Sequence, residues 1–126
     1  MFAHIALATR NVAATSRFFS ATLGWRQIRE AQNIEMTAAW MESAPGQQVH
    51  LIQVDDFQVS PFEHEFGRHF AFFHSRAEFP ALKERLVAHG ATLVDPLRTT
   101  PFERFFFRDP NGYLFEIVDR DGFIAE

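Results

Sequence analysis

Glu116 lies in the middle of an apolar stretch, GYLFEIVD, that has the composition of a buried strand. An ionised carboxylate in an apolar setting is costly unless a partner compensates its charge. An arginine such as Arg104 or Arg108 could be that partner. A divalent metal ion, held jointly by Glu116 and by imidazole side chains, is the other possibility. The metal alternative requires histidines at positions that a fold can bring to Glu116.

The histidines fall in a repeated pattern that includes Glu116. The segments AHIALATRN and RHFAFFHSR are both short apolar runs with a histidine in second place, which makes His4 and His69 equivalent. His50 follows His4 by 46 residues, and Glu116 follows His69 by 47. Aligning QVHLIQV with YLFEIVD sets His50 opposite Glu116. Each half of the chain therefore carries two potential ligands at matched separation.

Three imidazoles and a carboxylate would suit a first-row divalent metal: Zn, Ni, Mn, Co or Fe(II). Four protein ligands on an octahedral ion leave two positions for water or a chelating substrate. Such a site can stabilise an enolate or alkoxide and can acidify bound water. His4, His69 and Glu116 would already make a facial site, so His50 could lie outside the ligand set.

The other histidines and the aromatic run have ordinary explanations. His74 is five residues beyond His69 and so faces the opposite side of a continuous strand. His64 lies in a polar connecting segment, and His89 falls in the last turn of a predicted helix, where a cation is favoured. The three phenylalanines 105–107 are expected in the core.

The same repeat predicts the elements that carry these side chains. In the first half Asn11 is a plausible helix N-cap and Gly24 suits the helix end; in the second, Pro80 lies near the helix start and Gly90 closes it. Three strand-like runs follow each helix. They are Trp25–Glu30, Met36–Glu42 and Gln48–Val54 in the first half, and Ala91–Val94, Arg104–Arg108 and Tyr113–Val118 in the second.

We therefore expect an α+β fold made of two βαβββ modules. Module one is expected at about 1–55, a linker at about 56–67 within DDFQVSPFEHEFG, and module two at about 68–126. Because side chains alternate between the faces of a strand, each ligand candidate points to one side. Two such modules packed side by side could bring the four side chains to one point.

Composition excludes several classes of function. With 126 residues the chain fits one domain that can bury a sizeable core. The net charge of −4 and the lack of a basic stripe argue against nucleic-acid binding. The chain has no apolar run near the length of a membrane span and no basic-then-apolar leader, so neither a membrane nor a secretory role is expected. Cysteine is absent, which makes the cytoplasm the default location and excludes thiolate ligands.

With these residues placed, the sequence resembles the vicinal oxygen chelate superfamily, which includes glyoxalase I, fosfomycin-resistance and bleomycin-resistance proteins, and extradiol dioxygenases. The resemblance covers essentially the whole chain. It rests on AHIALATRNVAATSRFFSATLGW, RHFAFFHS and ERFFFRDPNGYLFEIVDRDG. The DPNGY turn followed by an apolar pair and a glutamate is its most specific part.

The resemblance implies that the two βαβββ modules form a curled mixed sheet, an open barrel around a metal. The family's ligand positions match His4, His50, His69 and Glu116. Glyoxalase I-like members typically carry Glu or Gln where His50 stands, and fosfomycin-resistance-like members use only the other three positions. Members of this size commonly form homodimers, so a homodimer is expected.

The leading hypothesis is a glyoxalase I-like lyase or isomerase that depends on a divalent metal. Its small-molecule substrate would chelate the metal through vicinal oxygens, and Glu116 would act as the base that moves a proton between adjacent carbons. One alternative is a metal-independent protein of the bleomycin-resistance type that sequesters an aromatic ligand. Another is an extradiol-type dioxygenase with Fe(II) held by His4, His69 and Glu116.

Overall fold

The computed structural model describes residues 2–29 and 37–124, and the chain divides into two compact units. Unit 1 spans Met1–Gln58 and unit 2 spans Val59–Glu126. The boundary falls inside the segment that the sequence predicts as a linker. No helix in the described ranges is long and apolar enough to cross a membrane.

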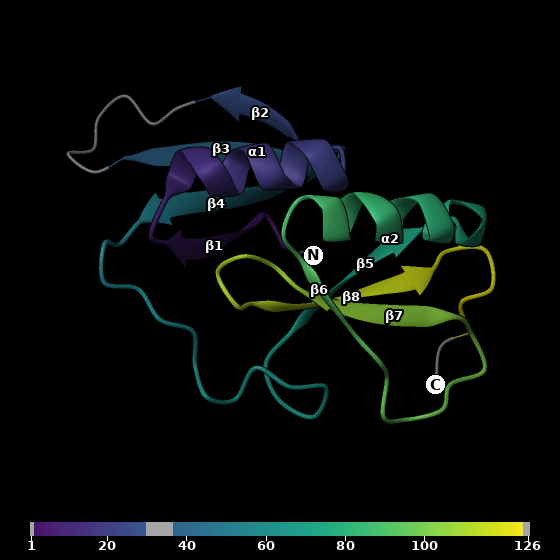
Figure 1. Ribbon diagram of the computed structural model, residues 1–126. Coiled ribbons are helices and arrows are strands. Elements are labelled where there is room, and N and C mark those ends of the chain that lie inside the picture. The colour runs from purple at the N-terminus through teal and green to yellow at the C-terminus, as the bar shows by residue number, and fades with distance from the viewer. Residues whose placement is uncertain (1, 30–36, 125–126) are drawn as a thin grey trace. The chain divides into compact units, whose positions relative to one another are not determined.

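Unit 1 places a helix against a mixed sheet. Its described strands pair in the order β1-β4-β3-β2, with β1 parallel to β4 and the other pairs antiparallel. Helix α1 packs on β3 and β4 (Figure 1). The elements are β1 His4–Thr9, α1 Val12–Thr22, β2 Arg26–Arg29, β3 Ala38–Ala44 and β4 Gln47–Gln53.

Local signals explain where α1 begins and ends. The Asn11 side chain accepts a hydrogen bond from the backbone N–H of Ala14 at 2.9 Å, which satisfies a donor that the first helical turn leaves free. Gly24 follows the helix with a φ of +73°, a left-handed conformation that glycine adopts without strain. On the buried side, Phe19 stacks on Trp25 at 4.3 Å between ring centroids. The helix is thereby fixed to the unit's core.

Unit 2 repeats this arrangement. Its described strands pair in the order β5-β8-β7-β6, again with a parallel first pair and antiparallel partners beyond it. Gly90 ends α2 at a φ of +95°, as Gly24 ends α1. The elements are β5 Phe70–His74, the short 3₁₀ helix η1 Arg76–Glu78, α2 Phe79–Ala88, β6 Thr92–Val94, β7 Arg104–Arg108 and β8 Leu114–Asp119. The predicted α+β class with paired βαβββ modules is confirmed.

The predicted strands differ from the observed ones mainly at their ends. β7 has the predicted bounds, and its three phenylalanines 105–107 are buried as expected. β3 runs to Ala44, beyond its predicted end, because a shift of register between Glu42 and Ala44 lets the strand continue to the turn before β4. Glu30 and Met36, at two predicted strand ends, lie outside the described residues.

Candidate metal centre

The predicted ligands occupy equivalent places in the two sheets. In unit 1, His50 on β4 lies across from Ala6, two residues beyond His4. In unit 2, Glu116 on β8 lies across from Ala71, two residues beyond His69. Residues that are directly opposite on paired strands project from the same face. Each unit thus presents its own pair of potential ligands on one face, as the alignment of the two halves predicts.

In unit 2 the imidazole of His69 meets the carboxylate of Glu116. His69 Nε2 lies 3.3 Å from Glu116 Oε1, and both side chains are largely buried. On the other side of the ring, His69 Nδ1 lies 3.3 Å from the backbone carbonyl oxygen of His64. A carbonyl can only accept, so Nδ1 carries the proton of this hydrogen bond. Nε2 is then the nitrogen that faces Glu116 and that is available to a metal ion when the ring is neutral.

This geometry fits a cation between the two side chains. With Nδ1 protonated, the Nε2 lone pair and the Oε1 lone pairs of an ionised carboxylate face each other and repel unless a proton or a metal ion lies between them. Metal bonds of about 2.0–2.2 Å on adjacent coordination positions separate two ligand atoms by about 3 Å. The spacing between His69 and Glu116 matches that value. A carbonyl on the outer nitrogen is also the usual way in which a ligating histidine is oriented.

In unit 1 the corresponding pair is stacked. The rings of His4 and His50 lie 4.1 Å apart and nearly parallel, and Trp40 stacks on His50 at 4.3 Å. His50 Nε2 lies 2.8 Å from Gln48 Oε1. Burial of the ring, with a smaller contribution from the charge of His4, lowers the pKa of His50 and favours the neutral form that binds metals. The two rings therefore meet face to face, whereas in unit 2 a ring nitrogen faces a carboxylate oxygen.

Glu116 also has the arginine partner that the sequence left open. Arg104 Nη1 donates to Glu116 Oε2 at 3.2 Å, and Arg104 Nη2 donates to Glu65 Oε2 at 2.9 Å. The Arg104 side chain is only 4% exposed. Burial would raise the pKa of Glu65, but hydrogen bonds from Leu97 N–H, Arg104 and Arg98 N–H together lower it. Two acidic side chains thus share one buried guanidinium.

Arg108, the other arginine that the sequence suggested as a partner of Glu116, binds backbone carbonyls. Its Nη1 donates to the carbonyl of Gly112 at 3.3 Å, and its Nη2 donates to the carbonyl of Glu63 at 2.8 Å. Its register position on β7, across from Leu114, lies beyond that of Glu116. Of the two proposed partners, Arg104 is therefore the one that contacts Glu116.

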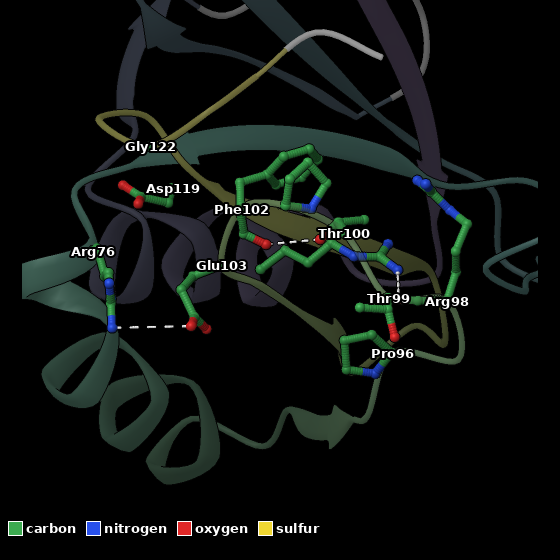
Figure 2. Close-up of a pocket in the computed structure, with 11 residues that line it drawn as sticks. Arg76, Pro96, Arg98, Thr99, Thr100, Phe102, Glu103, Asp119 and Gly122 are labelled. Carbon is green, nitrogen blue, oxygen red and sulfur yellow. Dashed lines mark hydrogen bonds and ion pairs between the residues drawn. The ribbon is translucent and has the colours of Figure 1, made fainter.

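A cavity of about 470 Å³ opens in unit 2 beside Arg104 (Figure 2). Arg76 and Arg98 also line it, with Glu103 and Asp119 as acidic neighbours. Arg76 lies 3.9 Å from Glu103 in a weak ion pair. Arg104 lines the cavity and also contacts Glu116, so it connects the wall of the cavity to the predicted ligand. The arginines come from three separate segments, which is why spacing along the sequence does not reveal them as a group.

The remaining histidines behave as the sequence predicts. His74 lies 3.8 Å from Glu78, and burial lowers its pKa although Glu78 opposes that shift. His89 Nδ1 lies 2.8 Å from the carbonyl of Arg85 at the end of α2. Within either unit, the described residues contain no group of three or more His, Asp or Glu side chains that could hold a metal. The predicted ligands are divided between the units, two in each.

Sequence reasoning missed Glu65. It lies in the predicted linker, where an acidic residue in a polar run gives no sign of burial, yet its side chain is 7% exposed. Its partners at Leu97, Arg98 and Arg104 are more than thirty positions away and become neighbours only on folding. The sequence offers no signal that would have identified it.

Comparison with known proteins gives one family and a set of similar folds. The family model "Glyoxalase/Bleomycin resistance protein/Dioxygenase superfamily" matches residues 1–117. No curated protein matches the sequence. The fosfomycin resistance protein FosX from Listeria monocytogenes has 19% identity and a TM-score of 0.77, over 100% of this chain and 94% of that one. A domain named glyoxylase/bleomycin resistance protein/dioxygenase from Frankia sp. EAN1pec has 22% identity and a TM-score of 0.76, over 94% and 96% of the two chains.

A further FosX structure carries ligands. It is a mutant of the Listeria protein complexed with Mn(II) and 1S,2S-dihydroxypropylphosphonic acid, and it has 21% identity and a TM-score of 0.75 over 94% of this chain and 88% of that one. At these identities the likeness shows a shared fold.

Proposed function

Since the chain belongs to the Glyoxalase/Bleomycin resistance protein/Dioxygenase superfamily, we propose that it is a divalent-metal-dependent enzyme acting on a small substrate through two neighbouring oxygens. The observation that carries the proposal is the His69–Glu116 pair, in which Nε2 lies 3.3 Å from Oε1 while Nδ1 faces the carbonyl of His64. A proton or a metal ion between these two atoms would satisfy both of them, and a solved structure of similar fold contains Mn(II), which favours the metal ion.

The ligand set that we propose is His4, His50, His69 and Glu116, with two residues from each unit. The equivalent register of the two pairs supports this choice. Zn, Ni, Mn, Co and Fe(II) all accept imidazole and carboxylate ligands. When bound, the metal would polarise the substrate oxygens and stabilise the negative charge that develops on them.

The reaction that we propose is a proton transfer between adjacent carbons of the substrate, of the glyoxalase I lyase or isomerase type. Glu116 would detach from the metal, which the histidines continue to hold, take the proton from one carbon through Oε1 and return it to the next. Arg104, bound to Oε2, would keep the carboxylate oriented while it does so. His69 would hold its place through the carbonyl of His64.

A second candidate is chemistry on a small phosphonate. Its support is the cavity that Arg76, Arg98 and Arg104 line, because Arg104 also contacts Glu116, a predicted ligand. Guanidinium groups pair well with the oxygens of such anions. Glu103 and Asp119 on the same wall offset part of that positive charge.

The proposed metal site is tested by titrating EDTA-treated protein with Mn(II), Ni(II), Zn(II) and Co(II) in a calorimeter. One ion per chain is expected. His4→Ala, His69→Ala and Glu116→Gln should each weaken binding at least tenfold, whereas His89→Ala, at the exposed end of α2, should leave it unchanged. His50→Ala decides whether His50 is the fourth ligand. Absence of binding to the unaltered protein would refute the proposal and leave ligand sequestration, which EDTA would not affect.

The reaction type is tested with the metal-loaded protein in D₂O and a panel of α-hydroxycarbonyl compounds. Proton transfer between adjacent carbons predicts deuterium at the exchanged carbon, detected by NMR, and its loss in Glu116→Gln. Turnover of phosphonates without such exchange would favour the second candidate. We also expect a homodimer, which sedimentation equilibrium would measure.

A further inference from the structure

The contacts of Arg104 suggest that Glu65, which does not touch Glu116, influences the position of Glu116 through Arg104. The guanidinium lies between two carboxylates: Nη1 donates to Glu116 Oε2 at 3.2 Å, and Nη2 donates to Glu65 Oε2 at 2.9 Å and to the carbonyl of Arg98 at 2.6 Å. Among the described residues, the buried Nε of Arg104 has no hydrogen-bond partner. The guanidinium therefore has donor capacity that it could still give to another carboxylate oxygen.

Glu65 does not depend on Arg104 for its position. Its Oε1 accepts from the backbone N–H of Leu97 at 2.7 Å, and its Oε2 accepts from the backbone N–H of Arg98 at 2.9 Å. Backbone donors are fixed by the fold, so this carboxylate is anchored at both oxygens before it meets the guanidinium. It presents a fixed negative charge to Nη2 of Arg104.

An arginine that is not restrained in this way tends to pair with a carboxylate through two parallel N–H···O bonds. Such a pairing with Glu116 would occupy both of its oxygens, including Oε1, which faces His69 at 3.3 Å. Glu65 binds Nη2 together with the carbonyl of Arg98, in an arrangement in which Nη1 meets Oε2 and Oε1 stays directed toward His69.

We propose that Glu65 is a positioning residue for the metal site: acting through Arg104, it keeps one oxygen of Glu116 available to a divalent cation. This inference rests on the proposed metal-binding function of His69 and Glu116. It adds to that function a competition between a guanidinium and a metal ion for the same carboxylate.

The competition predicts an unusual mutational pattern. In Glu65→Gln the side chain loses its charge, and one of its two former acceptor atoms becomes an amide donor that faces a backbone N–H. Nη2 of Arg104 then loses its charged partner and keeps the carbonyl of Arg98, so the guanidinium can turn more readily toward Glu116. Metal affinity should fall roughly 10- to 100-fold, the range typical of residues that orient metal ligands. Removing the competitor as well, in Glu65→Gln/Arg104→Met, should restore most of that affinity. A purely structural role for Glu65 would make the double variant bind as weakly as the single variant or more weakly.

The experiment is a Co(II) titration of the EDTA-treated full chain, followed by visible absorption, for the unaltered protein, Glu65→Gln, Arg104→Met and the double variant. Glu84→Gln, on the exposed side of α2, is the matched control and should bind like the unaltered protein. The shape of the absorption band reports whether the coordination geometry is retained. If Glu65→Gln is unfolded at the assay temperature, Glu65→Asp makes the same comparison, because its shorter side chain also releases Nη2.

Each result decides a different point. Weak binding by the single variant and recovery in the double variant support the positioning role. Equal affinity in the unaltered protein and Glu65→Gln, or no recovery in the double variant, would overturn that role and leave the metal site standing. No Co(II) binding by the unaltered protein would overturn the metal site and the positioning role together.

Discussion

Asp109 is a buried carboxyl at the head of the turn that leads into β8. Its Oδ1 accepts from the backbone N–H groups of Asn111 at 3.1 Å and Tyr113 at 2.9 Å. Burial raises the pKa of Asp109 from 3.8 to about 6, although these hydrogen bonds act in the opposite direction. The side chain of Asp109 thus stabilises the DPNG turn and is also an ionisable group buried in the fold. Burial could not be foreseen from the turn motif, because the motif is typical of exposed loops.

This pKa predicts how stability depends on pH. Between about pH 4 and pH 6 the folded protein holds a proton on Asp109 that the unfolded chain has released, so the free energy of unfolding should fall as the pH rises. The loss should level off above the folded-state pKa, at up to about 3 kcal/mol. Asp109→Asn removes this dependence. Urea unfolding of both proteins at pH 4 and pH 7 measures it, and equal changes in the two proteins would contradict the prediction.

At the scale of elements, hydrogen bonds of Glu63 attach the segment between residue 58 and β5 to the sheet of unit 2. Glu63 is 3% exposed, and its Oε1 accepts from the backbone N–H of Leu114 at 2.9 Å and from Arg68 at 2.7 Å. Arg108 on β7 donates to the carbonyl of Glu63. These contacts fix the backbone that places the His64 carbonyl against His69. The segment is therefore part of the support of the candidate site.

Replacing Glu63 by alanine should loosen this support. The Leu114 N–H would lose its acceptor in a buried place, which typically costs about 1–3 kcal/mol. We expect a fall of that size in the free energy of unfolding and faster hydrogen exchange at Leu114. Glu84→Ala is the control with the same chemical change on an exposed helix surface, where an effect within about 0.5 kcal/mol is expected. If the two variants were equally stable, Glu63 would not be an anchor.

The elements themselves follow from local signals, whereas their anchors do not. Asn11 and the glycines at 24 and 90 mark the helix ends because caps depend on a few neighbouring atoms. The strand β7 is recognisable because an unbroken apolar run has few alternatives to burial. Glu63 and Glu65 act through partners far along the chain, and their residue type is the same as that of any solvated glutamate. Only folding distinguishes them.

At the scale of the whole molecule, the repeat in the sequence becomes a repeat of strand order. Over the described residues both sheets place the first strand beside the fourth, in parallel. That pairing is what sets His4 near His50 and His69 near Glu116, so the prediction of equivalent ligand positions depended on topology and not on exact strand ends. Errors of two residues at β3 had no effect on it.

The proposed ligand set, with two residues from each unit, predicts that a bound metal ion raises the free energy of unfolding of the whole chain. At a free concentration 100 times its dissociation constant, a bound ion should add about 2.7 kcal/mol to the free energy of unfolding. Scanning calorimetry of EDTA-treated protein with and without Mn(II) should show the rise in melting temperature. His4→Ala in unit 1 and Glu116→Gln in unit 2 should each reduce it, by about half for a tenfold loss of affinity. An undiminished rise in His4→Ala would confine the ion to unit 2.

The matched registers of His50 and Glu116 place these two residues at equivalent positions in the two units. Under the proposed ligand set, one position carries an imidazole and the other a carboxylate, on strands with the same layout. Exchanging the two residue types at either position would then change the charge of the ligand set by one unit. Two equivalent units can in this way alter the electron-withdrawing power of a bound ion through single substitutions.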